Sequence, residues 1–215
     1  MDKDKIIIRS FKKDDRDPLR KLCADTAFMG EPVERFFQDR ELFADWACSY
    51  YTDYEPESIF VAEYEGSLCG YIMGSKDEPR YRRVSAELSR LFLKRTLGRF
   101  LFEPSSRNLL LSLAKSFVSG EFKRPDFSRY YPAHLHINVD KAFRNVRAGT
   151  MLMAEFEDYL LGAKVRGARL ATISARANRF FQKQGFGLLY RRRVTYFDYL
   201  TREEIYLSMY GKILE

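Results

Sequence analysis

Apolar residues recur along the chain with two different spacings. Short runs rich in β-branched and aromatic residues predict strands at 6–10, 59–64, 68–74, 133–139, 170–173, 185–190, 194–199 and 205–214. Apolar residues three or four positions apart predict helices near 18–23, 40–51, 85–101, 106–118, 149–163 and 176–184. This order of elements predicts an α/β (α+β) fold, a mixed sheet flanked by helices.

Residues 76–130 interrupt the alternation with two amphipathic helices rich in Arg, Lys, Leu and Phe. We interpret the segment as a helical insertion before the fourth strand. The remaining elements form a continuous pattern on either side of it, so we expect one domain over residues 1–215 that carries an insertion at about 76–130.

The net charge of +7 favours a phosphate-bearing partner such as nucleic acid, acidic lipid or a phosphorylated cofactor, although a solvated basic face explains it as well. No apolar run approaches the roughly 20 residues that span a bilayer. The first residues lack the apolar core of a signal peptide. Cys23, Cys48 and Cys69 lie in apolar settings without ligand spacing. We therefore expect no metal site, no membrane partner and a cytoplasmic location.

The most informative segment is 133–160, where a β-rich run is followed by a short loop and a strong helix. The loop holds Arg144, Arg147 and Gly149. Backbone N–H groups at a helix N-terminus bind anions, glycine permits close approach, and arginines add charge-assisted hydrogen bonds. The pattern predicts a phosphate site, although such a connection is often only structural.

This segment resembles the coenzyme-binding motif of the GNAT superfamily of N-acetyltransferases, Gln/Arg-x-x-Gly-x-Gly/Ala between a strand and a long helix. Arg144 matches the first position and Gly149 the last, while Arg147 replaces the first glycine. In a left-handed conformation Arg147 would cost roughly 1–2 kcal/mol. We favour a helical conformation, in which it could contact a phosphate.

A second segment, 174–190, resembles the superfamily's Asn-x-x-Ala-x-x-Phe-Tyr-x-Lys-x-Gly-Phe signature. Ser174 replaces the Asn and Phe181 replaces the Tyr. The matching residues are Ala177, Phe180, Lys183, Gly185 and Phe186. Together the resemblance covers most of 5–75 and 131–215 and leaves the insertion out.

The resemblance implies a mostly antiparallel, twisted sheet of about seven strands that binds acetyl-CoA as cosubstrate. The pantetheine arm would pair with the strand backbone at 137–139, and the pyrophosphate would lie on the loop at 144–150. Arg176 is a further candidate contact. The expected coenzyme-binding residues are Ile137, Asn138, Val139, Arg144, Asn145, Val146, Arg147, Ala148, Gly149, Thr150, Asn178 and Phe181.

Candidate catalytic residues are fewer. His134 and His136 share one face of the predicted strand with Asn138, and a histidine suits a general base, although both could be structural. Phe181 cannot act as the superfamily's tyrosine acid. Water, Tyr131 or Tyr190 could replace it, or catalysis could be absent.

These features predict an N-acetyltransferase that transfers acetyl to a primary amine of a small molecule or protein, by direct attack in a ternary complex. The alternative is a GNAT-like module that binds coenzyme A or a partner without turnover. A nucleic-acid-binding role is less favoured, because Phe92 and Phe100 have helical core spacing. Glu31, Glu34 and Asp39 are candidate contacts for a cationic acceptor. The insertion is expected to cap the acceptor cleft or to make a homodimer contact.

Overall fold

The computed structural model describes residues 5–99, 101–144 and 146–214. Short 3-10 turns join several of the main elements. The strands and α-helices in chain order are β1 (Ile6–Ser10), α1 (Arg16–Asp25), α2 (Arg40–Tyr54), β2 (Ile59–Tyr64), β3 (Ser67–Ser75), α3 (Glu78–Gly98), α4 (Pro104–Val118), β4 (Ala133–Val139), α5 (Ala148–Gly162), β5 (Gly167–Thr172), α6 (Ala175–Lys183), β6 (Gly187–Val194) and β7 (Ile205–Ile213).

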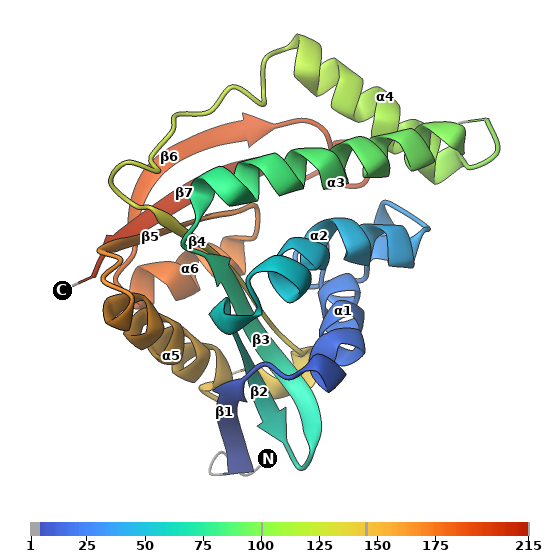
Figure 1. Cartoon of the computed structure of the whole chain (residues 1–215). Helices are drawn as coiled ribbons and strands as arrows, with labels where there is room; N and C mark the ends of the chain where they lie inside the picture. Colours follow the sequence, from blue (N-terminus) through green and yellow to red (C-terminus); the bar gives the residue numbers. More distant parts are fainter. Residues whose placement is uncertain (1–4, 100, 145, 215) are drawn as a thin grey trace.

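The strands of the described residues form one seven-stranded sheet in the order β1-β2-β3-β4-β5-β7-β6. Neighbouring strands are antiparallel except β4 and β5, which are parallel. Figure 1 shows the twisted sheet between α5 on one side and α1 and α2 on the other. The predicted fold class, a mostly antiparallel sheet flanked by helices, is confirmed.

Two hydrophobic cores lie on the two faces of this sheet, because side chains alternate along each strand. On β3, Tyr71 and Met73 pack toward α1 and α2. Ile72, between them, packs toward α5, where Leu152 and Phe156 are fully buried. The helices are thus held by apolar stripes that match opposite faces of one sheet.

The insertion before the fourth strand is confirmed as two helices, with β3 and β4 paired directly across its base. Helix α3 starts at Glu78, seven residues before the predicted start at Ser85. Asp77 caps it by accepting a hydrogen bond from Arg80 N–H at 3.0 Å, and Pro79 occupies its first turn. The aliphatic residues of the buried stripe begin only at Val84, so periodicity missed the first turn.

The strand predicted at 194–199 is wrong beyond Val194, which instead ends β6. Turns follow, with Asp198 N–H bonded to Thr195 O at 3.0 Å. Tyr196 is buried, and the Phe197 ring lies 5.0 Å from that of Phe28. The aromatic residues that favoured a strand instead pack in the core beside α1.

No helix in the described ranges combines the length and the apolar character needed to cross a bilayer.

Gly74 sets the distance between the sheet and α5. A Cβ at this position would lie 2.3 Å from Phe156 Cζ and 2.5 Å from the His134 carbonyl oxygen. We predict that Gly74→Ala lowers the free energy of unfolding by about 1–3 kcal/mol, because the backbone of β4 must move. Urea unfolding measures the change.

Gly162→Ala is the matched control, because nothing lies within 4 Å of the added methyl group at the end of α5. It should be neutral or stabilise by up to about 1 kcal/mol. Equal losses in the two variants would contradict the assigned packing of α5 on β3.

Candidate functional site

The central feature of the site is the separation of β4 from β5. The two parallel strands pair only at Ala133–Ala168 and His134–Arg169. Beyond that point residues 135–139 keep β3 as a partner on one edge, and in the described residues no strand pairs with the other edge. The gap opens a cleft of about 740 Å³ lined from both strands.

The fork where the strands part is fixed by an ionic cluster. Arg169 donates to the carbonyl oxygens of Tyr131 and Pro132 and pairs with Glu78 from α3. Burial would raise the pKa of Glu78, but hydrogen bonds and the charge of the surrounding partners lower it to about 2. The carboxylate is therefore ionised near neutral pH and ties the insertion to the base of the cleft.

At one end of the cleft, Arg147 is the N-cap of α5 and has a left-handed backbone, with φ 67° and ψ −1°. The prediction of a helical conformation is wrong. The superfamily motif has glycine here because a left-handed residue with a side chain costs roughly 1–2 kcal/mol. The first intrahelical bond runs from Met151 N–H to Arg147 O at 2.9 Å. The N–H groups of the preceding helical residues are thus available to a ligand.

Three arginines surround this helix end. Arg144, Arg147 and Arg176 line the cleft, and none has a carboxylate partner within the described residues. Burial and the neighbouring charge of Arg176 lower the pKa of Arg144. Clustered unpaired cations around free amide donors form a strong anion site.

Most of the predicted coenzyme residues lie on this cleft. The predicted residues that line it are His136, Ile137, Asn138, Val139, Arg144, Arg147, Ala148, Gly149, Thr150 and Phe181. Asn145 lies outside the described residues. Val146 and Asn178 are described but do not line the cleft; Val146 packs against the core beside α5. The buried Asn178 Oδ1 has no hydrogen-bond partner within the described residues.

Phe181 both lines the cleft and packs in the core. It is buried, with ring centroids 5.9 Å from Phe186 and 6.3 Å from Tyr210. It brings no hydroxyl group to the cleft.

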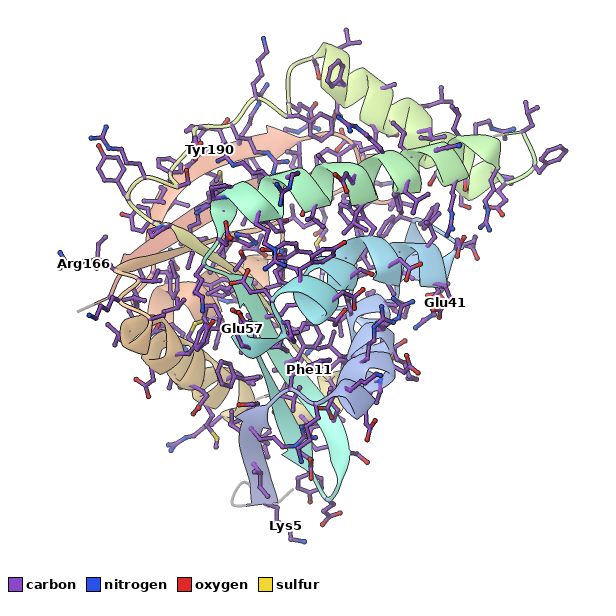
Figure 2. All side chains as sticks on the ribbon, viewed as in Figure 1. Lys5, Phe11, Glu41, Glu57, Arg166 and Tyr190 are labelled. Carbon is purple, nitrogen blue, oxygen red and sulfur yellow. The ribbon has the colours of Figure 1, made fainter. Side chains whose placement is uncertain are left out.

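The two predicted tyrosine substitutes do not line the cleft. Tyr190 lies on the edge strand β6, where Figure 2 labels it, and pairs with Met209 on β7. Tyr131 lies against Gly167 and Gly211. Within the described residues no hydrogen bond joins either tyrosine to His134 or His136.

The two histidines share a face of β4, as the alternation predicted, but only His136 lines the cleft. His136 is solvent-accessible at the cleft wall, and the protein atoms around it desolvate the ring and lower its pKa to about 4. His134 is buried, with Nε2 3.1 Å from Tyr51 Oη and Nδ1 3.3 Å from Glu78 Oε2. Burial lowers the pKa of His134 as well.

The opposite half of the cleft is aromatic, and its residues were not predicted as site residues. They come from α2, β3 and α3 and include Phe43, Trp46, Tyr50, Tyr51, Tyr71 and Tyr81. No Asp or Glu side chain of the described residues lines the cleft. Trp46 and Tyr50 have the apolar helical spacing of a core stripe, and nothing in the sequence separates a cleft-lining stripe from a core stripe.

Two tyrosine hydroxyls bond to groups on β4. Asn138 Nδ2 donates to Tyr71 Oη at 2.7 Å, and Tyr51 Oη bonds to His134. Burial raises the pKa of both phenols well above the usual value, so both stay protonated.

The acidic residues suggested for a cationic acceptor are occupied elsewhere. Glu31 pairs with Lys141, Glu34 with Arg40 and Asp39 with Arg99. None of the three lines the cleft. Tyr81, on the inner face of α3, does line the cleft, so the insertion covers its aromatic half. Nor does any cluster of His, Cys, Asp and Glu in the described residues suit a metal ion.

Comparison with known proteins gives matches of structure. No family model matches the chain, and no curated protein matches it in sequence. A protein named SsHAT superposes with a TM-score of 0.66 at 21% identity, covering 98% of each chain. Arylalkylamine N-acetyltransferase 2 from Aedes aegypti gives 0.65 at 14% identity, covering 98% of this chain and 99% of the other. Polyamine N-acetyltransferase from Drosophila melanogaster gives a TM-score of 0.61 at 16% identity, covering 97% of this chain and 100% of the other.

At these identities the likeness is one of fold, and it extends over nearly the whole of each chain. The insertion is included in that coverage. The protein has the fold of the GNAT superfamily of N-acetyltransferases, which its two sequence motifs predicted.

Proposed function

We propose that the protein is an acetyl-CoA-dependent N-acetyltransferase that acetylates a primary amine by direct attack in a ternary complex. The observation that carries the proposal is the cleft between β4 and β5, with a cationic helix end on one side and an aromatic chamber on the other. An extended, anionic cosubstrate and an apolar amine would meet at the unpaired edge of β4.

Support for coenzyme binding comes from the fit of the residues present. The pantetheine amides would pair with the free backbone groups at 137–139. The pyrophosphate would accept hydrogen bonds from the amides of Ala148, Gly149 and Thr150. The three unpaired arginines would offset its negative charge and lose their mutual repulsion.

The acceptor half favours a primary amine on an aromatic or apolar body. Aromatic faces can hold an ammonium group by cation–π attraction and pack against a ring. A second cation on the acceptor would find no carboxylate among the lining residues. A compound with two cationic ends would therefore bind more weakly, because its second cation would lose its water without gaining a carboxylate partner.

The chemistry uses the acetyl thioester that the cosubstrate supplies. The amine nitrogen forms a bond to the carbonyl carbon, the carbon–sulfur bond breaks, and the leaving thiolate takes a proton from water. His136, neutral near pH 7, accepts a proton from the attacking nitrogen. Tyr51, whose ring centroid lies 5.7 Å from that of His136, and Tyr71, which bonds to Asn138, remain protonated donors. His134 acts as a positioning residue through its hydrogen bond to Tyr51.

A second candidate function is coenzyme binding without turnover. Phe181 favours it, because the residue at the motif's tyrosine position packs in the core and offers no proton. The tyrosine hydroxyls on the aromatic half favour catalysis, since they provide hydrogen-bond donors in the same cleft at positions other than that of Phe181.

We also propose that the described chain works as one domain, because α3 of the insertion supplies part of the cleft wall. The three cysteines are buried and unpaired, which supports the proposed cytoplasmic location.

Arg147 provides the first test of the coenzyme site. Arg147→Gly should raise the free energy of unfolding by roughly 1 kcal/mol, because glycine accepts the left-handed backbone. It should also weaken coenzyme A binding by roughly tenfold or more, because a charge-assisted phosphate contact is lost. Urea unfolding and calorimetry measure the two effects.

Pantetheine, which lacks the phosphates, is the ligand control and should bind equally to both proteins. Arg179→Ala, an exposed residue of α6 outside the cleft lining, is the protein control and should leave coenzyme affinity unchanged. If Arg147→Gly weakened the binding of pantetheine and of coenzyme A equally, Arg147 would not be a phosphate contact.

An amine panel tests turnover and acceptor class together. Thioester cleavage followed by free-thiol release should give kcat/KM for phenethylamine roughly tenfold or more above that for agmatine or putrescine, because only the first lacks a second cation. Trp46→Ala should raise KM for phenethylamine. Coenzyme binding with no cleavage for any amine would establish the binding-module alternative, and agmatine as the better acceptor would reject the aromatic assignment.

The pH dependence tests the role of His136. A pKa of about 4 leaves this ring neutral above roughly pH 5, so kcat/KM should rise with pH only as the acceptor amine loses its proton. The midpoint should shift between two amines of different pKa. His136→Gln should lower kcat/KM by roughly 100-fold without changing coenzyme affinity. An inflection near the usual histidine pKa, common to both amines and absent in His136→Gln, is the contrary result.

A further inference from the structure

The excess positive charge of the protein is confined to the insertion. Residues 76–130 contain thirteen Lys and Arg against six Asp and Glu, a net charge of +7. The whole chain has 37 and 30, so the remaining residues carry 24 of each sign and are neutral overall. The proposed coenzyme site, which lies outside 76–130, does not account for this excess.

The same segment concentrates exposed apolar side chains. Of the nineteen large apolar side chains exposed in the described residues, nine lie between 91 and 122. They are Leu91, Leu93, Leu97, Leu101, Phe102, Leu111, Phe117, Val118 and Phe122. Leu101 and Phe102, in the turn between α3 and α4, are 77% and 84% exposed.

Charged and apolar residues alternate on the outer faces of the two helices. On α3, Lys94 lies between Leu93 and Leu97. On α4, Lys115 follows Leu111 by one turn and precedes the exposed Val118. Seven exposed cations on these helices have no carboxylate partner within the described residues: Arg80, Arg83, Arg90, Lys94, Arg95, Arg107 and Lys115.

The inner faces of the helices are already occupied. Val84 and Leu109 are buried, and the Phe92 ring packs 5.0 Å from that of Phe37. Figure 1 shows the two helices at the periphery of the molecule, with their connecting turn at the free end of the hairpin. The outer surface is therefore presented by a fixed scaffold and can bind a partner without unfolding.

We propose that the outer face of the α3–α4 hairpin binds the surface of an anionic lipid bilayer. This proposal departs from the expectation of no membrane partner, which rested on the lack of a spanning apolar run and of a signal peptide. The exposed leucines and phenylalanines would enter the headgroup region, while the surrounding Lys and Arg contact lipid phosphates and carboxylates. Such alternation of apolar and cationic residues is typical of interfacial helices, whose affinity combines apolar burial with attraction to anionic lipid.

Charge complementarity separates this partner from two others. A second copy of the chain would bring two faces of net positive charge together, which opposes a symmetric contact. A nucleic acid would satisfy the cations, but its phosphate backbone offers nothing to the exposed aliphatic side chains. An anionic bilayer offers both components.

Vesicle flotation of the full chain tests the proposal, with phosphatidylcholine alone and with about 30 mol% phosphatidylserine. The protein should float only with the anionic vesicles, and binding should weaken as salt rises. Lys94→Glu/Lys115→Glu should reduce the partition coefficient by roughly tenfold or more, since each cation near the surface contributes about fivefold.

Matched variants distinguish a local effect from a general one. Lys13→Glu/Arg35→Glu makes the same change in net charge at exposed positions outside the insertion and should reduce binding far less. Leu101→Ser/Phe102→Ser should reduce binding to anionic vesicles, whereas Ile7→Ser/Leu188→Ser, also at exposed positions, should not. Unchanged thermal unfolding checks that each variant is folded.

Failure to float with anionic vesicles would overturn the proposal, as would equal losses in the insertion and control variants. So would sedimentation as a dimer that Leu101→Ser/Phe102→Ser dissociates in the absence of lipid. Stronger binding to duplex DNA than to anionic vesicles at the same salt would also reject it. None of these measurements depends on acetyl transfer, so the outcome is independent of the proposed activity.

Discussion

The site depends on the loss of pairing between two parallel strands. β4 and β5 pair at two positions and then separate, and the cleft opens between them where they separate. The separation leaves backbone groups of β4 unpaired in the middle of the sheet. Helix α5 begins beside this opening, and its N-terminus is directed at it. The fork is also fixed from outside the sheet, because Glu78 of the insertion pairs with Arg169 of β5. An element inserted between β3 and β4 therefore helps to hold the shape of the common fold.

Much of the fold could be predicted from the sequence, because strands and helices with one buried face leave a clear period. Strand β1, the β2–β3 pair, β4 and α5 were predicted to within a residue or two. Residues 194–199 were mistaken for a strand because aromatic side chains fill a core from turns as well as from strands. The parting of β4 and β5 has no sequence signal of its own, since both strands have ordinary apolar composition.

Only part of the candidate site could be predicted, because local motifs leave a signal in the sequence and tertiary contacts do not. Arg144 and Gly149 could be found because a local motif fixes both the backbone and the chemistry. The conformation of Arg147 could not, because arginine does not indicate a left-handed backbone. The glycine at this position of the GNAT motif that the loop resembles was the better guide. The aromatic half combines residues from α2, β3 and α3 that are distant in sequence. Only the tertiary arrangement shows that they share one chamber.

The unpaired edge of β4 has a consequence for what the cleft can accept. A free strand edge in a folded protein is ordinarily a liability, because it can pair with any extended chain and so promotes aggregation. Here the edge lies in the middle of the sheet, with β5 diverging beside it and helices above and below. A second sheet cannot reach it, and only a single thin chain with alternating amide donors and acceptors can. The architecture thus acts as a steric filter that protects the protein from self-association and admits a narrow class of extended ligand.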